Sequence, residues 1–370
     1  MTEHRRTGIR DRRALVVAAL AGLLAVRAAP AQQQPGEAQP APATAATPAA
    51  PAAPATPPTG APASGAAGRP PAGKVLPTRA LSIAELLAAS KPSEWQPLEP
   101  ESTLYMELAT GRVVIALAPE FAPRHVENIR KLARAHWYDG LAITRVQDNF
   151  VTQWGDPLNS TPEVGEKRLP AEMTRPAAGL GFRRLSDPDS YAPEVGFVGP
   201  FPAARSAPGG EAWAVHCYGT VGVGRDNDPA GAIGTELYAV IGHAPRQLDR
   251  NATVVGRVVK GIELLSALPR GTGDLGFYDQ PEQRVPIQSI RVAAELPAAE
   301  RTPLELLRSD SPTFARIIEV RRNRRDAWYK VSAGRIDVCN VPLPVREASG
   351  KPADRASGGA AEGGAPRARL

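Results

Sequence analysis

The stretch RVQDNFVTQWGDP, residues 145–157, holds the most informative pattern in this chain. It places an arginine five residues before an aromatic residue, Phe150, and it ends in a Gly-Asp-Pro turn signal. Two segments, one around 143–146 that overlaps the start of this stretch and one around 150–154 within it, have the apolar, β-branched and aromatic composition of short strands. The stretch therefore predicts two short strands, one with an arginine and one with an aromatic residue.

Short elements of the same kind lie on both sides. An antiparallel hairpin is expected over 104–117, because apolar residues alternate with polar ones and Thr110-Gly111 marks a turn. One helix begins at Pro123, where apolar residues recur at helical spacing, and a second lies near 262–265. Further strands are expected at 220–223, 237–241, 253–258 and 287–292. Many short strands with only two helices predict a closed all-β barrel.

Seven motifs in these segments occur in the order found in one known family. They are Ala122-Pro123 with 126–128, then 138–141, 145–157, 169–172, Arg225 with 228–229, 248–249 and 255–258. In this order, residues 103–294 resemble the cyclophilin family of peptidyl-prolyl cis-trans isomerases. The resemblance implies a mainly β fold with a closed antiparallel eight-stranded β-barrel and two flanking helices. It also implies isomerisation of X-Pro bonds without a cofactor, on unfolded or extended polypeptides that contain proline.

The chemistry of this reaction needs no nucleophile, because no bond breaks. Rotation about an X-Pro bond meets a barrier of about 18–20 kcal/mol, and without help it takes tens to hundreds of seconds. An apolar slot that holds the proline ring, together with a fixed cation that donates to the twisting amide, would stabilise the twisted state. Arg145 is the expected catalytic donor, since a guanidinium stays charged when half-buried and keeps a planar geometry.

The resemblance also implies which side chains form the groove beside Arg145. Five residues are expected to line the slot for the proline ring: Phe150, Val151, Leu237, Tyr238 and Leu248. Gln153 is expected to hold either the peptide backbone or Arg145, and Glu236 brings a carboxylate into the substrate-binding region.

The chain departs from the family pattern at several of these positions. Thr144 precedes the arginine where the family usually has His. Trp154 replaces the first glycine of a turn, where its large indole would either narrow the groove or pack outward. Glu236 stands where the family has Gln, and if it pairs with Arg145 it partly occupies the guanidinium before substrate binds. The family's pocket His falls on Ala252. We therefore expect reduced or specialised activity. Two other functions remain open: a non-catalytic module that binds an extended peptide or a partner, and an envelope assembly scaffold whose C-terminal helix matters most.

The first 31 residues have the features of an export signal. Arginines precede a 13-residue apolar stretch, 14–26, and Ala29-Pro30-Ala31 offers a small-residue cleavage site. The alternative is a short buried helix, but the segment that follows offers it nothing to pack against. We therefore expect a periplasmic or secreted protein.

Charge and hydropathy argue against two classes of partner. Of 44 basic and 38 acidic residues, the first 31 residues hold six and two, which leaves 38 against 36. A net charge of +2 is too small for binding a phosphate backbone, so no nucleic-acid partner is expected. No apolar run reaches the roughly 18 residues of a membrane-spanning helix. The histidines show no metal-ligand spacing, so we expect no metal. The protein is expected to be monomeric, as part of its interpretation as a cyclophilin-type isomerase.

The rest of the chain divides by composition. Residues 32–75 form a linker expected to be disordered, because 32–73 contain 15 Ala and 11 Pro in 42 residues. A short helical lead-in, 76–102, starts with a capping box at Ser82 and Glu85. The barrel carries an insertion at 158–217 that is longer than the family's loop, and a disordered tail is expected over 347–370.

A helical C-terminal extension is expected over 295–346. Thr302 and Glu305 have the spacing of a second capping box, and a longer helix begins at Ser311-Pro312 and extends to Trp328. Its basic face predicts solvent exposure, with an acidic partner or lipid headgroups as the alternative.

The chain has two cysteines, Cys217 and Cys339. They are too few for a disulfide-built scaffold and too far apart for a structural zinc site. In an oxidising periplasm the two could form a disulfide that joins the extension to the barrel, and free thiols are the alternative.

Overall fold

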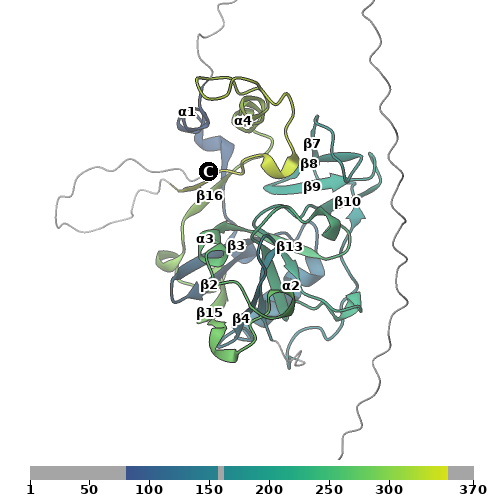
Figure 1. The fold of residues 1–370 in the computed structure, drawn as a ribbon, viewed down its shortest axis with the longest axis vertical. Coiled ribbons are helices and arrows are strands. Elements are labelled where there is room, and N and C mark those ends of the chain that lie inside the picture. The colour runs from purple at the N-terminus through teal and green to yellow at the C-terminus, as the bar shows by residue number, and fades with distance from the viewer. Residues whose placement is uncertain (1–80, 157–161, 349–370) are drawn as a thin grey trace, which may run out of the picture. The chain divides into compact units, whose positions relative to one another are not determined.

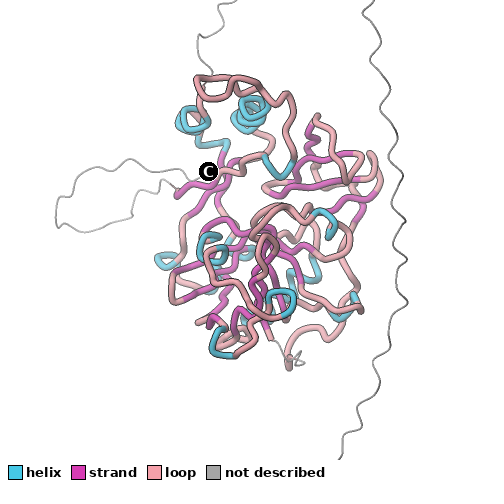
Figure 2. Tube along the Cα trace, viewed as in Figure 1, coloured by secondary structure: helices cyan, strands magenta, loops and turns pink. Residues whose placement is uncertain are grey.

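The computed structural model describes residues 81–156 and 162–348. The expected export signal at 1–31, the linker at 32–75 and residues 349–370 of the expected tail lie outside these ranges. The tail was expected to begin at 347, but Glu347 is the last residue of a strand and the Ala348 amide donates to Pro303. Within them the chain is mainly β, with four α-helices (Figures 1 and 2). None of these helices is long and apolar enough to cross a bilayer.

The main sheet within residues 103–292 has nine antiparallel strands. Its order is β14-β4-β5-β12-β11-β13-β3-β2-β15. The bounds, in that order, are Val285–Pro286, Ala142–Val146, Val151–Gly155, Glu236–Val240, Thr220–Val223, Val254–Lys260, Gly111–Leu117, Thr103–Leu108 and Ser289–Val292. Each strand expected from the sequence is present, and the predicted mainly β fold is confirmed.

One continuous segment, residues 285–292, supplies the strands at both edges of this sheet. β14, at its start, pairs with β4, and β15, at its end, pairs with β2. Between them, Ile287 donates its backbone N–H to Leu141 and Gln288 donates to Glu107. Residues 285–292, most of which were expected as a single strand at 287–292, thus bond to β4 and the residue before it on one side and to β2 on the other. This arrangement is consistent with an eight-stranded barrel that closes on itself.

The two flanking helices of this sheet are α2, Pro123–Arg134, and α3, Ile262–Ser266. α2 buries Val126, Ile129 and Leu132 against the barrel core, as their helical spacing predicts. Ala122 at its N-cap has no capping side chain, and the first amide groups of the helix instead donate to the Glu172 carboxylate. Burial alone would raise the pKa of Glu172, but these bonds and the contact with His125 lower it.

The insertion forms a second sheet, which the sequence did not predict. Its order is β6-β10-β9-β8-β7, with bounds Arg175–Pro176, Glu211–Ala214, Phe201–Arg205, Glu194–Val198 and Arg183–Leu185. Alternate residues of its central strands β8, β9 and β10 point to opposite sides, and both sides are buried there. Val198 and Phe201 pack against the barrel residue Val254, whereas Phe197 and Trp213 pack against the C-terminal extension. The insertion therefore lies between the barrel and the extension.

The C-terminal extension contains strands as well as a helix. Its strands β16, Leu304–Leu307, and β17, Val345–Glu347, form a three-stranded sheet with β1, Trp95–Pro97, of the lead-in, in the order β1-β16-β17. The predicted capping box at Thr302 is wrong, because the residues after it pair as β16. Helix α4, Pro312–Arg322, begins at the predicted N-cap, Ser311, whose hydroxyl accepts from the Phe314 amide.

Helix α4 is shorter than expected and ends before Trp328, whose side chain is 81% exposed. It lies beside α1, Ile83–Ala88, which opens with the predicted capping box at Ser82 (Figure 1). The ring of Phe314 on α4 meets that of Phe197 edge-on, with centroids 5.0 Å apart. This contact joins the extension to the insertion sheet.

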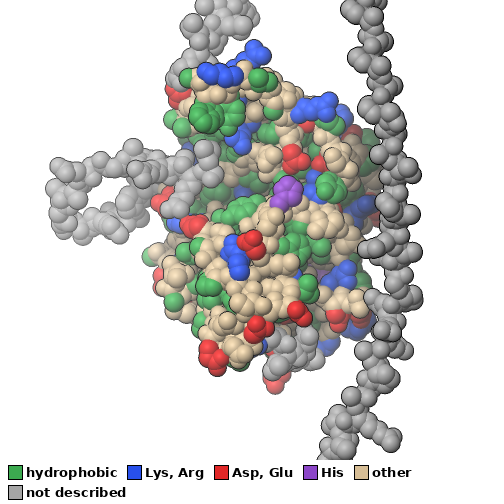
Figure 3. All heavy atoms as spheres, viewed as in Figure 1, with side chains coloured by type: hydrophobic (Ala, Val, Ile, Leu, Met, Phe, Trp, Pro, Cys, Tyr) green, Lys and Arg blue, Asp and Glu red, His purple; other side chains and the backbone are tan. Residues whose placement is uncertain are grey.

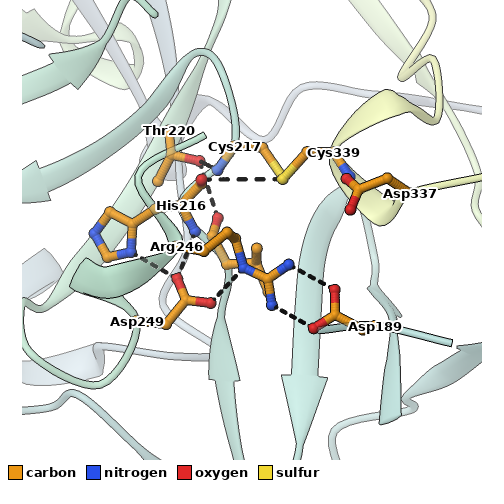
Figure 4. Close-up of a disulfide and its surroundings, with 9 residues drawn as sticks. Asp189, His216, Cys217, Thr220, Arg246, Asp249, Asp337 and Cys339 are labelled. Carbon is orange, nitrogen blue, oxygen red and sulfur yellow. Dashed lines mark hydrogen bonds and ion pairs between the residues drawn. A yellow bond between two sulfur atoms is a disulfide. The ribbon is translucent and has the colours of Figure 1, made fainter. Parts of the chain in front are cut away.

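Cys217 and Cys339 are joined by a disulfide, with their Cα atoms 5.0 Å apart (Figure 4). Cys217 precedes β11 of the barrel sheet and Cys339 lies in the extension, so the bond links two parts of the chain separated by 122 residues. On the face drawn in Figure 3, basic and acidic side chains are interspersed with apolar ones.

Candidate active site

A groove of about 570 Å³ opens on the barrel sheet beside β4, β5 and β12. Six of the seven substrate-binding residues expected from the sequence line it, together with the expected catalytic residue Arg145: Phe150, Val151, Gln153, Glu236, Tyr238 and Leu248. Residues that the sequence did not indicate complete the wall, among them Val223, Gly224, Arg225, Asp226, Asn251, Leu275 and Phe277. Ala252, where the resemblance places a histidine, also lines the groove.

Arg145 reaches this groove because the pairing of β4 with β5 shifts between Ile143 and Arg145. Such a bulge changes the direction of the side chain that follows it. The guanidinium lies between two aromatic rings, with its central carbon 5.5 Å from the centroid of Phe150 and 5.3 Å from that of Phe277. Both distances are within the range of a cation–π interaction.

Three hydrogen bonds fix the orientation of the Arg145 guanidinium. It donates from Nε to the carbonyl of Leu275 at 2.7 Å, from one terminal nitrogen to Gln153 Oε1 at 3.1 Å, and from the other to Gln147 Oε1. A guanidinium has five N–H donors, so two remain for a substrate. Burial lowers the pKa of Arg145 and the charge of Glu236 opposes this shift, but an arginine stays protonated at neutral pH.

The carbonyl that fixes Arg145 comes from a residue with unusual backbone geometry. Leu275 has a φ of 56°, in the left-handed region that a leucine rarely adopts. Gly276, with φ of 80°, follows it, and an added Cβ there would lie 2.7 Å from the backbone of Gln147. The loop can therefore approach β4 closely and present its carbonyl to the arginine.

Gln153 connects Arg145 to Glu236. Its amide oxygen accepts from the arginine, and its Nε2 donates to Glu236 Oε2 at 3.3 Å. Burial raises the pKa of Glu236, and the charge of Asp156 adds to this, whereas Gln153 and Arg145 lower it. The expected pairing of Glu236 with Arg145 is thus indirect, and the guanidinium keeps free donors.

The apolar wall of the groove is a small cluster separate from the barrel core. Val151, Tyr238, Val240 and Ala252 are buried in it, and Phe150 and Leu248 pack against them. An apolar surface of this kind suits a proline ring, which has no donor and needs only shape and exclusion of water.

Two expectations about the groove are wrong. Leu237 does not line it, because side chains alternate along β12 and Leu237 is 1% exposed inside the barrel core, between Glu236 and Tyr238 on the groove face. Trp154 neither narrows the groove nor packs outward. Its indole is fully buried in the same core, one position after Gln153 on β5.

Tyr238 joins the groove to a buried polar network, of which Figure 4 shows His216, Asp249, Arg246 and Asp189. The Tyr238 hydroxyl lies 2.8 Å from Nε2 of His216, and Nδ1 of that histidine lies 3.0 Å from Asp249 Oδ1. Asp249 accepts from Nε of Arg246 at 2.7 Å, and the terminal nitrogens of Arg246 donate to both oxygens of Asp189. Since Asp189 lies in the insertion, the network links the groove wall to the second sheet.

Within 81–156 and 162–348, no three histidine, cysteine or acidic side chains lie close enough together to hold a metal ion. The groove residues described above can bind an apolar ring, exclude water and donate hydrogen bonds from a fixed cation.

Comparison with known proteins agrees with this geometry. Residues 103–292 match the family model "Cyclophilin type peptidyl-prolyl cis-trans isomerase/CLD". A Brucella suis biovar 1 protein named "Probable peptidyl-prolyl cis-trans isomerase" is 29% identical over 206 residues, which cover 55% of this chain and 87% of that protein. "Peptidyl-prolyl cis-trans isomerase-like 1" of Homo sapiens is 24% identical over 213 residues, covering 57% and 99%.

The fold extends the similarity beyond the barrel. The crystal structure of cyclophilin AquaCyp293 from Hirschia baltica matches with a TM-score of 0.57 and 24% identity, and it covers 71% of this chain and 96% of that one. With the family model matching more than half of the chain, the conclusion is direct: this protein belongs to the family of cyclophilin-type peptidyl-prolyl cis-trans isomerases.

Proposed function

We propose that the groove isomerises X-Pro bonds in unfolded or extended segments of exported proteins, with Arg145 as the donor that stabilises the twisted amide. The observation that carries this proposal is the position of Arg145, half-buried between two aromatic rings, held by three hydrogen bonds and facing an apolar wall. No cofactor is needed, because the reaction is a rotation.

The mechanism follows from what each wall can do. The apolar cluster around Phe150 and Tyr238 holds the proline ring and removes water from the bond. As the bond twists, the amide nitrogen loses conjugation and becomes a better acceptor. A free N–H of Arg145 donates more strongly to this nitrogen in the twisted state than in either planar state, so the barrier falls. Gln153 and Leu275 keep the guanidinium in place, so little reorganisation is needed.

The test of the apolar slot is Phe150→Ala. Because Phe150 contacts the ring in the ground and twisted states alike, we expect KM to rise about tenfold with little change in kcat. Measurement is by initial rates on an X-Pro peptide. Tyr218→Ala, which removes an exposed aromatic residue outside the groove, is the matched control and should leave both constants unchanged. A fall in kcat alone would instead mean that Phe150 acts by supporting Arg145.

The location belongs to the same proposal. An arginine-rich start followed by an apolar stretch supports export, and so does the Cys217–Cys339 disulfide, since such bonds persist in oxidising compartments. A periplasmic or secreted isomerase would act on chains that fold after crossing the membrane.

The expected result for the disulfide is that protein isolated from its own cells contains no free thiol. Cys339→Ser should lower the free energy of unfolding by about 2–4 kcal/mol, because the bond closes a long loop in the unfolded chain. Thiol labelling followed by mass spectrometry checks the first point, and urea unfolding checks the second. Two labelled thiols in freshly isolated native protein would contradict both the bond and the oxidising location.

A further inference from the structure

One wall of the groove carries a carboxylate whose hydrogen-bonding capacity is largely unused. Glu236 begins β12 and faces the groove, and the bond from Gln153 Nε2 to its Oε2 is long, at 3.3 Å. A carboxylate has about four acceptor sites. Among the described residues, Glu236 takes part in no ion pair within 4.0 Å. The carboxylate is therefore partly buried without a direct ion pair, and the more distant charge of Arg145 does not cancel the effect of burial on its pKa.

Gly224 keeps the space in front of this carboxylate open. An added Cβ at Gly224 would lie 3.4 Å from Glu236 Oε2 and 3.0 Å from Glu236 Cβ. Gly224 does not have a positive φ, so its backbone conformation does not call for glycine. What the missing side chain provides is access from the groove to Glu236.

The cations of the groove are occupied by other partners. Arg145 donates to Leu275, Gln153 and Gln147, and it makes no direct ion pair with Glu236, although its charge lowers the pKa of that carboxyl. Arg225 donates to the backbone carbonyls of Asn251 and Asp226. An incoming ammonium or guanidinium would therefore find Glu236 without a competing ion pair, and it would offset the burial that raises the pKa of this carboxyl.

We propose that Glu236 selects substrates with a lysine or arginine within two residues of the proline. Glu236 and Tyr238 lie on the same face of one strand, two positions apart, which places them roughly 7 Å from one another. An extended peptide covers about the same distance in two residues. A proline ring on the Tyr238 wall thus puts a neighbouring side chain beside Glu236. This inference rests on the proposed function and adds a substrate class to it.

The experiment compares three X-Pro peptides that differ at one position near the proline, carrying Lys, Gln or Glu there. Isomerisation is followed by NMR exchange spectroscopy, because a coupled protease would impose its own preference for charge. For the wild-type protein we expect kcat/KM for the Lys peptide to exceed that for the Gln peptide by on the order of tenfold, and the Glu peptide to be slowest. In Glu236→Gln, which keeps the side-chain length and an acceptor oxygen, the three rates should agree within about twofold.

Two further variants separate Glu236 from the general field of the groove. Gly224→Ala should reduce the Lys preference by covering the carboxylate, whereas Asp226→Asn, which neutralises an exposed acid at the groove edge, should leave most of it. A preference that survives in Glu236→Gln, or equal rates for the three peptides on an active wild-type protein, overturns the inference.

The outcome in which no peptide is isomerised would count against the proposed function, and titration of the same peptides then decides the inference. Tighter binding of the Lys peptide to the wild-type protein than to Glu236→Gln would support the selection of basic segments by a binding groove. Equal dissociation constants would overturn it.

Discussion

Arg145→Ala is expected to lower kcat/KM for an X-Pro peptide by about 10²–10³-fold, as the loss of one preorganised donor does in other active sites. The guanidinium is positioned before the substrate arrives, since Leu275 and Gln153 hold it and the rings of Phe150 and Phe277 flank it. Its interaction with the amide nitrogen is strongest in the twisted state. The loss should therefore appear in kcat, with KM changed by only a few-fold.

Arg145→Lys tests whether charge alone suffices. An ammonium keeps the charge but lacks the planar group of N–H donors that bonds to Leu275 and Gln153 at the same time. We therefore expect kcat/KM to fall at least tenfold. Arg184→Ala, at an exposed arginine of the insertion, is the control for removing a positive charge and should retain full activity. If Arg145→Ala and the wild-type protein isomerise the peptide at the same rate, the groove binds peptides without turning them over, and the non-catalytic interpretation replaces the proposal.

Sequence reasoning found most of the groove because its residues lie in short motifs with fixed spacing. Arg145 and Gln153 lie on the neighbouring antiparallel strands β4 and β5, and Phe150 is in the short connection just before β5, so their separation in the chain fixes their separation in space. The assignment of Leu237 to the groove is wrong although the strand pattern of the sequence argues against it. Strand alternation puts Glu236 and Tyr238 on one face and the residue between them on the other.

Other parts could not be read from one sequence. Leu275 and Phe277 enter the groove from a loop with no periodicity, and only the folded chain brings them to Arg145. The sequence predicts the insertion at 158–217 but not its sheet, because prolines and glycines in it are typical of loops. Its central strands, β8 to β10, are short and buried on both faces, which removes the polar alternation that marks a strand. His216 carries no local signal of its bond to Tyr238.

Arg246→Ala is expected to lower the free energy of unfolding by about 3–5 kcal/mol, because it leaves two buried carboxylates without their cation. Arg246 is 4% exposed and bonds to Asp249 of the barrel and Asp189 of the insertion (Figure 4). Burial alone would raise the pKa of Asp249, but His216 and Arg246 lower it. Asp249 therefore adds stability above the pKa of an unfolded aspartate, about 3.9, and loses it as the pH falls through the lower folded value.

Because the pKa of Asp249 is lowered in the folded protein, the pH dependence of stability is a second measurement that tests this prediction. In Arg246→Ala, Asp249 loses a cation that lowers its pKa and favours its protonated form more, so the difference in stability from the wild-type protein should shrink as the pH falls from 7 toward about 4. Urea unfolding at several pH values, with the disulfide intact, measures it. Arg270→Ala removes an arginine of an exposed pair, 39% and 76% accessible, and should cost less than about 1 kcal/mol.

The double variant Arg246→Ala with Asp189→Asn decides whether the cost comes from uncompensated charge. Removing one of the two carboxylates should recover part of the stability lost in Arg246→Ala, which a cavity left by the arginine side chain would not allow. Equal stability of Arg246→Ala and Arg270→Ala at pH 7 would mean that water reaches the cluster. The insertion would then be held to the barrel by its apolar face, through Val198 and Phe201, and not by charge.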